Sequence, residues 1–151
     1  MSFWNTLRIS ETALNAQRLR LDTISNNLAN IETTHTVEGG PYQRKDVVFT
    51  PKGENQFRPT FIAARRNNGI LNDPSQGGVT VASIVTDTSP GSRVYDPTHP
   101  DADKEGFVTY PNVNIITEMT NMLSATRSYE ANLAAVDASK RMALRALEIG
   151  R

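Results

Sequence analysis

The chain has 151 residues with 16 basic and 16 acidic side chains, so its formal net charge is zero. This length fits one domain, or one small domain carried on helices, and the balanced charge argues against nucleic-acid and anionic-membrane partners. The absence of cysteine excludes disulfides and thiolate chemistry. No window reaches the ~18 apolar residues of a membrane helix, and the first residues lack the basic and apolar regions of a cleavable signal peptide.

Proline and glycine are concentrated in the middle of the chain. All 8 prolines lie from Pro41 to Pro111, and Gly150 alone among the 9 glycines lies outside residues 39–111. Because these residues interrupt helices, the sequence predicts an α+β fold. Long N- and C-terminal helices are expected to pair as a coiled coil, forming a helical core domain from residues 1–38 and 112–151. A small β-rich domain is expected to be inserted between them at residues 39–111.

Apolar residues in the N-terminal segment predict the first helix. Leucine recurs every seven residues, and isoleucines fill the alternate positions near the end of the pattern, which is typical of a helix-pairing seam. A smaller stripe is formed by Ile9, Ala13 and Ala16. We expect this helix to pair antiparallel with the C-terminal helix. Its predicted assembly-interface residues are Leu7, Leu14, Leu21, Ile24 and Leu28, and Ile31 continues the same seam.

Asparagines cluster where this helix is expected to end. Asn26, Asn27 and Asn30 fall within five residues, on a face beside the seam. Asparagine favours caps and turns over helix interiors because its carboxamide competes for backbone hydrogen bonds. The cluster therefore predicts a helix end whose carboxamides bond to adjacent backbone.

The middle of the chain predicts short strands separated by turns. Alternating or β-branched segments are bounded by glycine, proline and asparagine, as expected for a small sheet. The candidate strands are Tyr42–Phe49, Phe61–Arg66, Val79–Val85, Arg93–Tyr95 and Phe107–Tyr110. Residues 72–78 are expected to form a mobile loop.

Steps of three and four residues continue through the C-terminal segment and predict a long helix. We expect it to span Asn114–Ile149, about 54 Å, with Asn112 or Asn114 as N-cap and Gly150 as C-cap. The seam consists of Met119, Met122, Thr126, Tyr129, Leu133, Val136, Lys140, Ala143 and Leu147. Because Ala131, Ala134 and Ala138 form a second stripe beside it, we expect more than one partner. The predicted assembly-interface residues here are Met119, Met122, Tyr129, Leu133, Val136 and Leu147.

Catalytic and metal-binding patterns are weak. Asp101, Asp103, Glu105 and Gly106 match the first half of a calcium loop, but position 12 is Asn112 rather than glutamate. The two histidines, at positions 35 and 99, lie far apart, and neither a nucleophile motif nor a phosphate-binding glycine loop is present. We therefore expect no catalytic residue, cofactor or metal, and we expect a solvated acidic turn.

Motifs at both ends resemble those of one family. Asn26-Asn27-Leu28-Ala29-Asn30 resembles the shared motif of bacterial flagellar axial proteins, which include rod, hook and hook-associated proteins. The middle segments around Gly39–Tyr42 and Tyr95–Val108 are similar to the short proximal rod proteins. The residues that resemble the C-terminal helix motif of the family are Asn112, Asn114, Glu118, Met119, Arg127 and Tyr129.

This resemblance implies a structural, non-enzymatic subunit of the flagellar basal-body rod. Such a subunit polymerises into a helical tubular array that transmits torque and continues the export channel. The resemblance also implies export through the flagellar type III apparatus without a cleaved signal peptide, and assembly in the periplasm. The implied partners are the other proximal rod subunit, the distal rod proteins and the rod–ring adaptor. Alternatives are another axial protein of rod or hook type, or a soluble coiled-coil adaptor or chaperone, which would be fully helical as a monomer.

Overall fold

The computed structural model describes residues 3–37, 39–52 and 77–149. Helix α1 spans Phe3–Ala29 and helix α3 spans Ile115–Ile149. The strands between them are β1 (Lys45–Pro51), β2 (Val79–Thr86), β3 (Arg93–Tyr95) and β4 (Phe107–Thr109). The predicted α+β class is confirmed, with a helix toward each end of the chain and small antiparallel sheets between them.

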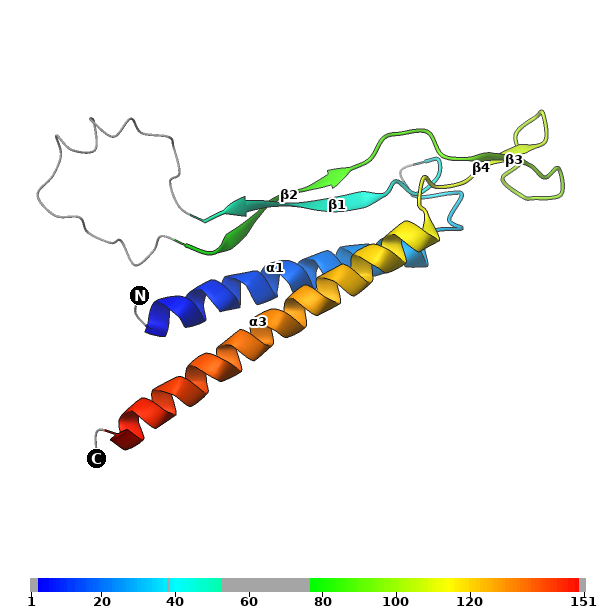
Figure 1. Ribbon diagram of the computed structural model, residues 1–151. Coiled ribbons are helices and arrows are strands. Elements are labelled where there is room, and N and C mark those ends of the chain that lie inside the picture. Colours follow the sequence, from blue (N-terminus) through cyan, green and yellow to red (C-terminus); the bar gives the residue numbers. More distant parts are fainter. Residues whose placement is uncertain (1–2, 38, 53–76, 150–151) are drawn as a thin grey trace, which may run out of the picture.

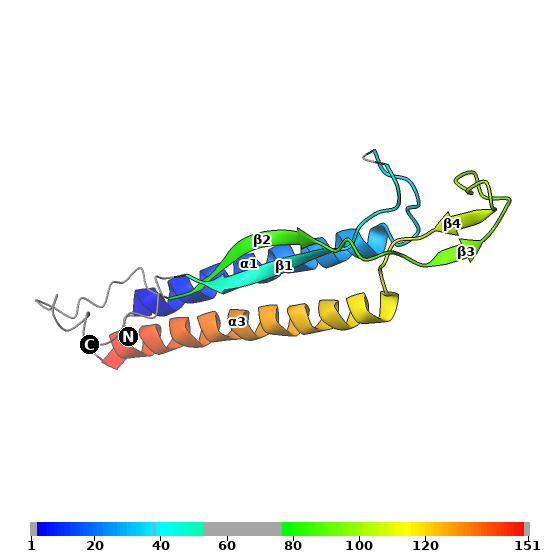
Figure 2. The same cartoon turned by 90° about the horizontal axis from the view of Figure 1, so that it is seen from above.

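The two helices lie side by side and run in opposite directions (Figures 1 and 2). Helix α3 begins one residue after the predicted start because Asn114 caps it. The Asn114 side-chain oxygen accepts hydrogen bonds from the backbone N–H groups of Ile116 at 2.9 Å and Thr117 at 3.2 Å. This geometry satisfies two of the free donors at a helix N-terminus. The predicted C-cap, Gly150, lies outside the described residues.

Helix α1 is shorter than the predicted segment of residues 1–38, because it ends at Ala29. The Asn30 carboxamide donates to the carbonyl of Asn26 at 2.8 Å, and the Thr33 hydroxyl donates to the Asn30 side-chain oxygen at 3.2 Å. These side chains take up groups that would otherwise continue the helix. The prediction that asparagine carboxamides bond to adjacent backbone at the helix end is therefore confirmed for Asn30.

The strands form two separate sheets, so the prediction of one small sheet was wrong. Strand β1 pairs antiparallel with β2, and β3 pairs antiparallel with β4. Between β2 and β3 the chain passes through Pro90 and Gly91, and proline cannot donate to a strand ladder. The break at this segment divides the strands into two pairs. The predicted strand at residues 61–66 and nearly all of the predicted loop at 72–78 lie outside the described residues.

The β1–β2 pair lies along α1, which thereby has two neighbours (Figure 1). Where β2 begins, the backbone N–H of Val79 donates to the Thr12 hydroxyl at 3.1 Å. Gly78 has a φ of +113°, and a Cβ at that position would lie 2.5 Å from the Thr12 hydroxyl oxygen. Only glycine combines this backbone conformation with such a close approach. The hairpin is thus held against the N-terminal half of α1.

The core between these elements is built from small side chains. The buried apolar residues of the helices and β1 are Ala16, Ile24, Val47 and Ala125. Small residues let helix and hairpin backbones approach closely, but they bury little apolar surface. The sheet β3–β4 lies beyond the end of the helices (Figure 1) and buries Val108.

Candidate assembly surface and its junction

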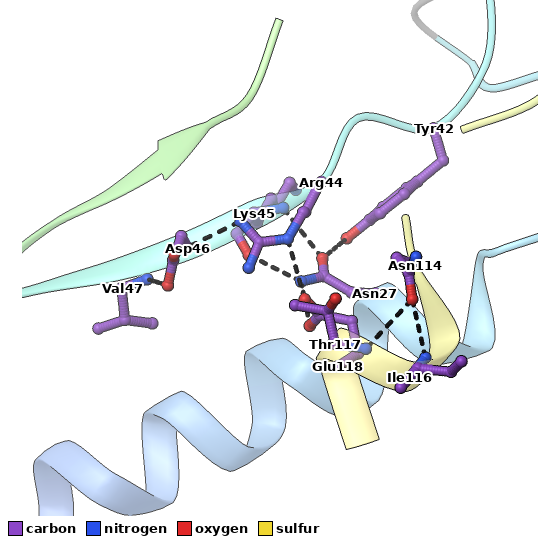
Figure 3. Close-up of polar contacts among 10 residues, drawn as sticks. All are labelled: Asn27, Tyr42, Arg44, Lys45, Asp46, Val47, Asn114, Ile116, Thr117 and Glu118. Carbon is purple, nitrogen blue, oxygen red and sulfur yellow. Dashed lines mark hydrogen bonds and ion pairs between the residues drawn. The ribbon is translucent and has the colours of Figure 1, made fainter. Parts of the chain in front are cut away.

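A buried carboxamide joins three elements at the end of α1. The Asn27 side chain is fully buried. Its nitrogen donates to the Lys45 carbonyl at 2.8 Å and to Glu118 Oε2 at 3.1 Å. Its oxygen accepts from the Lys45 backbone N–H at 2.9 Å and from the Tyr42 hydroxyl at 3.0 Å. These contacts use the full hydrogen-bonding capacity of the amide (Figure 3).

Glu118 extends this junction to α3. The carboxylate is fully buried, and its Oε1 accepts a hydrogen bond from Arg44 Nε at 2.9 Å (Figure 3). Arg44 also lies 3.4 Å from Asp46. A buried carboxylate is tolerated when it is paired and hydrogen-bonded. The set of Asn27, Tyr42, Arg44, Lys45 and Glu118, which we call the junction, therefore fixes the starts of α3 and β1 relative to the end of α1.

Burial and charge shift the pKa values of two residues in the junction. Burial raises the pKa of Tyr42 above its ordinary value of 10.0, and the negative charge of Glu118 raises it further. Burial alone would lower the pKa of Arg44, but the hydrogen bond and charge of Glu118, aided by Asp46, outweigh that effect and raise it. The junction thus holds a neutral tyrosine and a charged arginine.

The predicted interface residues of α1 differ in burial. Ile24 is buried and the other four, the leucines of the heptad pattern, are partly exposed. Ile9 and Thr12 face the hairpin, and at about 100° per residue the leucine seam lies on roughly the opposite side of α1.

The predicted interface residues of α3 divide into two groups. Met122, Tyr129 and Val136 are partly buried. Their neighbours on the buried face, reached by alternating steps of three and four, are small or polar, namely Glu118, Ala125, Asn132 and Ser139. Met119, Leu133 and Leu147, at the other predicted positions, are exposed. The buried face of α3 thus combines small and polar residues with three larger ones, whereas Met119, Leu133 and Leu147 stay exposed.

Among the described residues of α3, eight large apolar side chains are exposed, and seven of them lie on one side of the helix, whereas Met142 lies off that side. At about 100° per residue the seven positions span roughly 140° of the helix surface, so they share one stripe. We call this set the outer stripe, and its members, exposed by 46–76%, are Ile115, Ile116, Met119, Leu123, Leu133, Leu144 and Leu147. Among the elements of the described residues, α3 contacts α1 alone. An apolar stripe of this length on a helix with a single neighbour is typical of a contact surface between proteins.

The acidic turn is arranged around local polar partners. The Thr34 hydroxyl donates to Asp101 at 2.6 Å, and Asp103 lies 3.4 Å from Arg93. His99 Nδ1 accepts from the Asp101 backbone N–H at 3.1 Å, and the exposed His35 lies in the loop beside the turn. Within residues 3–37, 39–52 and 77–149, no three or more histidine, cysteine, aspartate or glutamate side chains are grouped so that they could hold a metal ion.

Comparison with known proteins bears on both ends of the chain. Residues 7–34 match the family described as "Flagella basal body rod protein", and residues 104–149 match the family described as "Flagellar basal body rod FlgEFG protein C-terminal". The chain is 45% identical to "Flagellar basal-body rod protein FlgC" of Borreliella burgdorferi, covering 99% of this chain and 98% of that protein. It is 43% identical to the protein of the same name from Bacillus subtilis, covering 100% of both. The chain belongs to the FlgC family of flagellar basal-body rod proteins.

Membership of the FlgC family establishes the kind of protein. The Salmonella typhimurium member is 36% identical over 100% of both chains, so the similarity includes the middle segment as well as the helices. The chain is a structural subunit of the proximal rod in the flagellar basal body, and it is not an enzyme. It assembles with other flagellar rod components. No helix of the described residues has the length and apolar character needed to span a bilayer.

The two matched segments meet at the junction. Asn27 lies in the first and Glu118 in the second, and their side chains are hydrogen-bonded. The other residues of the predicted family motif occupy different places. Asn30 ends α1 and Asn114 caps α3, whereas Asn26, Ala29, Asn112 and Arg127 are exposed and Leu28 is partly exposed.

The sequence did not single out Arg44, Lys45 or Thr12. Arg44 and Lys45 stand beside Asp46 in a short charged run at the start of β1, which is typical of a solvated strand end. Their role depends on contacts across 18 and 74 positions of the chain. Only the fold brings those partners together.

Proposed function

We propose that the outer stripe of α3 is the surface through which this rod subunit contacts its neighbours. In this arrangement subunits form a helical tubular array that transmits torque and continues the export channel. The observation that carries the proposal is that seven large apolar side chains on one side of α3 stay exposed although α3 packs against α1. Burying half of one such side chain contributes roughly 1 kcal/mol, and a stripe of them favours association. A contact that does not close on itself then builds an open array.

The helical pairing inside the subunit supports this division of roles. We infer that α1 and α3 pair as a short antiparallel coiled coil, forming the helical core domain of residues 1–38 and 112–151. Residues 39–111 would then form the β-rich domain, oriented by the junction. The leucines of α1 stabilise the subunit, whereas Met119, Leu133 and Leu147 contact other subunits.

The partners follow from family membership. We infer that the neighbours are the other proximal rod subunit, the distal rod proteins and the rod–ring adaptor. Export through the flagellar type III apparatus, without a cleaved signal peptide, would deliver the subunit to the periplasm. A coiled-coil adaptor or chaperone has no comparable support, because the relatives are rod proteins over their full length.

Replacing Leu133 with aspartate tests the proposed surface. A carboxylate buried between subunits without a partner opposes association. In cells lacking the native subunit, we expect Leu133→Asp protein to be made and exported but absent from purified basal bodies, and we expect the cells to be non-motile. Ser124→Asp is the matched control, because Ser124 is also exposed on α3 but lies off the outer stripe.

The control variant should support motility and enter basal bodies at the native level. Normal incorporation of the Leu133→Asp subunit would show that the outer stripe is not an interface. Loss of incorporation in both variants would show that any added charge on α3 blocks assembly, which would also contradict the proposal.

A further inference from the structure

The outer edge of β1 is capped by side chains. The backbone N–H and carbonyl of Lys45 point away from β2, because both bond to the Asn27 carboxamide at 2.9 and 2.8 Å. Two residues on, the Val47 N–H donates to the Asp46 side chain at 2.8 Å. Pro51 ends the strand and carries no N–H. This edge is therefore capped at Lys45 and Val47 and lacks a donor at Pro51.

The outer edge of β2 is open along most of its length. Thr86 lies opposite Lys45 and Ile84 lies opposite Val47, so the backbone groups of Thr86 and Ile84 also point outward. The register shifts between Val48 and Phe49, which places Val81 in the outward position beyond the shift. Among the described residues, β2 pairs with β1 alone.

The composition of β2 lacks the usual protection of a free edge. Its sequence, VTVASIVT, contains no charge and no proline. Ile84 and Val85 are 48% and 49% exposed. Edge strands in natural proteins are normally protected by lysine, proline or a covering element. An uncharged, β-branched free edge is instead a site for strand addition.

We propose that β2 pairs antiparallel with β2 of a second copy of this chain. The strand is self-complementary about the midpoint between Ala82 and Ser83, since this register places Ile84 opposite Val81 of the second copy and Val85 opposite Thr80. The register shift makes Ile84 and Val81 both outward-facing, so the two residues can exchange backbone hydrogen bonds. Such β-branched pairs stabilise antiparallel strands.

The capped edge of β1 determines where this association stops. Because β1 is partly capped and β2 is not, we expect pairing through β2 alone and a four-stranded sheet. Four strands are more stable than an isolated two-stranded pair. Figure 2 shows β2 on the side of the hairpin away from α3, so the pairing leaves the outer stripe uncovered. A two-fold contact closes on itself, and we therefore assign it to the free subunit before assembly.

Sedimentation velocity and hydrogen exchange of the purified full chain test this pairing. The native chain should form dimers as its concentration rises, and the Ile84 and Thr86 amides should then exchange about tenfold more slowly. Ile84→Pro removes an outward N–H without removing a bond to β1, and it should weaken dimerisation roughly tenfold or more. Ile84→Lys keeps the N–H but adds a charge at the edge and should act in the same direction.

Ile84→Val is the matched control and should dimerise like the native chain, because it keeps the N–H and the β-branched shape. A chain that stays monomeric at all concentrations would overturn the proposal. So would association that Ile84→Pro and Ile84→Lys both retain, or association without protection of the Ile84 and Thr86 amides.

Discussion

Two buried polar side chains, Asn27 and Glu118, hold together the end of α1, the start of β1 and the start of α3. Neither side chain is exposed to solvent, and each has its partners within hydrogen-bonding distance. In a core of small apolar side chains, such contacts specify geometry more than they add net stability. Removing one partner leaves the others buried without hydrogen bonds, and that loss is where the cost arises.

Alanine substitutions at Asn27 and Asn30 should differ in their effect on stability. Asn27→Ala leaves the Lys45 backbone groups without their partner and removes one of the two hydrogen bonds of the Glu118 carboxylate, so we expect a loss of roughly 2–3 kcal/mol in the free energy of unfolding. Asn30→Ala removes only local bonds at a partly exposed helix end and should cost less than about 1 kcal/mol. Denaturant unfolding of both variants measures the difference. Equal losses would show that the junction does not depend on Asn27.

The pKa of Tyr42 should lie above the ordinary value of a tyrosine. Burial, and then the charge of Glu118, raise its pKa above 10.0, so the folded state favours the neutral hydroxyl that donates to Asn27. The Tyr42 hydroxyl therefore contributes fully to stability below pH 10.0, the ordinary pKa of tyrosine. This contribution is lost as the pH rises through the raised pKa of Tyr42 in the folded chain.

Ultraviolet absorbance titration should show the late-ionising phenol in the native chain and not in Tyr42→Phe. A Tyr42→Phe titration curve that keeps the late phase would assign it to another tyrosine.

At the scale of elements, the β1–β2 pair is held to α1 by contacts at both ends. The junction holds β1 at the C-terminal end of α1, and Thr12 holds β2 near its N-terminal half. This arrangement leaves α1 covered on two sides, by α3 and by the hairpin. Helix α3, in contrast, keeps one side free.

Gly78→Ala should release the hairpin from α1. Its φ of +113° is strained for any residue with a Cβ, and the added methyl group would meet the Thr12 hydroxyl. We expect a loss of about 1–2 kcal/mol from the backbone conformation, with a further loss from the contact. Gly39→Ala is the control, because its φ is +90° but nothing lies within 4 Å. Thermal unfolding should show the larger loss for Gly78→Ala, and equal losses would contradict tight packing at Thr12.

The sequence predicts some of these elements well, for identifiable reasons. The start of α3 was predictable because Asn114 follows the last proline and bears a capping side chain. The end of α1 was predictable from the asparagine cluster, because the Asn30 carboxamide bonds back to the Asn26 carbonyl where the helix ends. The division of the strands into two sheets was missed although Pro90 and Gly91 mark the break, because a local pattern does not report which strands pair.

The orientation of α3 was the least predictable feature of the candidate site. Apolar spacing groups Met119 and Leu133 with Met122 and Tyr129, but the structure turns the first two away from α1. Glu118 is drawn inward by Asn27 and Arg44, and the rest of the helix follows that rotation. The spacing of apolar residues therefore predicted the helix correctly, but it predicted only some of the residues on the buried face of that helix. Long-range polar contacts decided the remainder.

At the scale of the whole molecule, the surfaces divide into an internal and an external set. The leucine seam of α1 is partly buried, whereas the outer stripe of α3 and the side chains of Ile84 and Val85 in β2 are exposed. A rod subunit of the FlgC family needs both a defined internal geometry and an exposed surface that can bind neighbouring subunits. In our account the junction supplies the first and α3 supplies the second.

Thiol labelling in assembled basal bodies tests this central claim most directly, because the chain has no native cysteine. Leu123→Cys places a thiol on the outer stripe, and Ser124→Cys places one at the next position, off the stripe. In the free subunit both thiols should react. In assembled basal bodies we expect the thiol at position 123 to be shielded and the thiol at 124 to remain more reactive. Equal reactivity at position 123 before and after assembly would contradict the outer stripe as the contact surface of the rod.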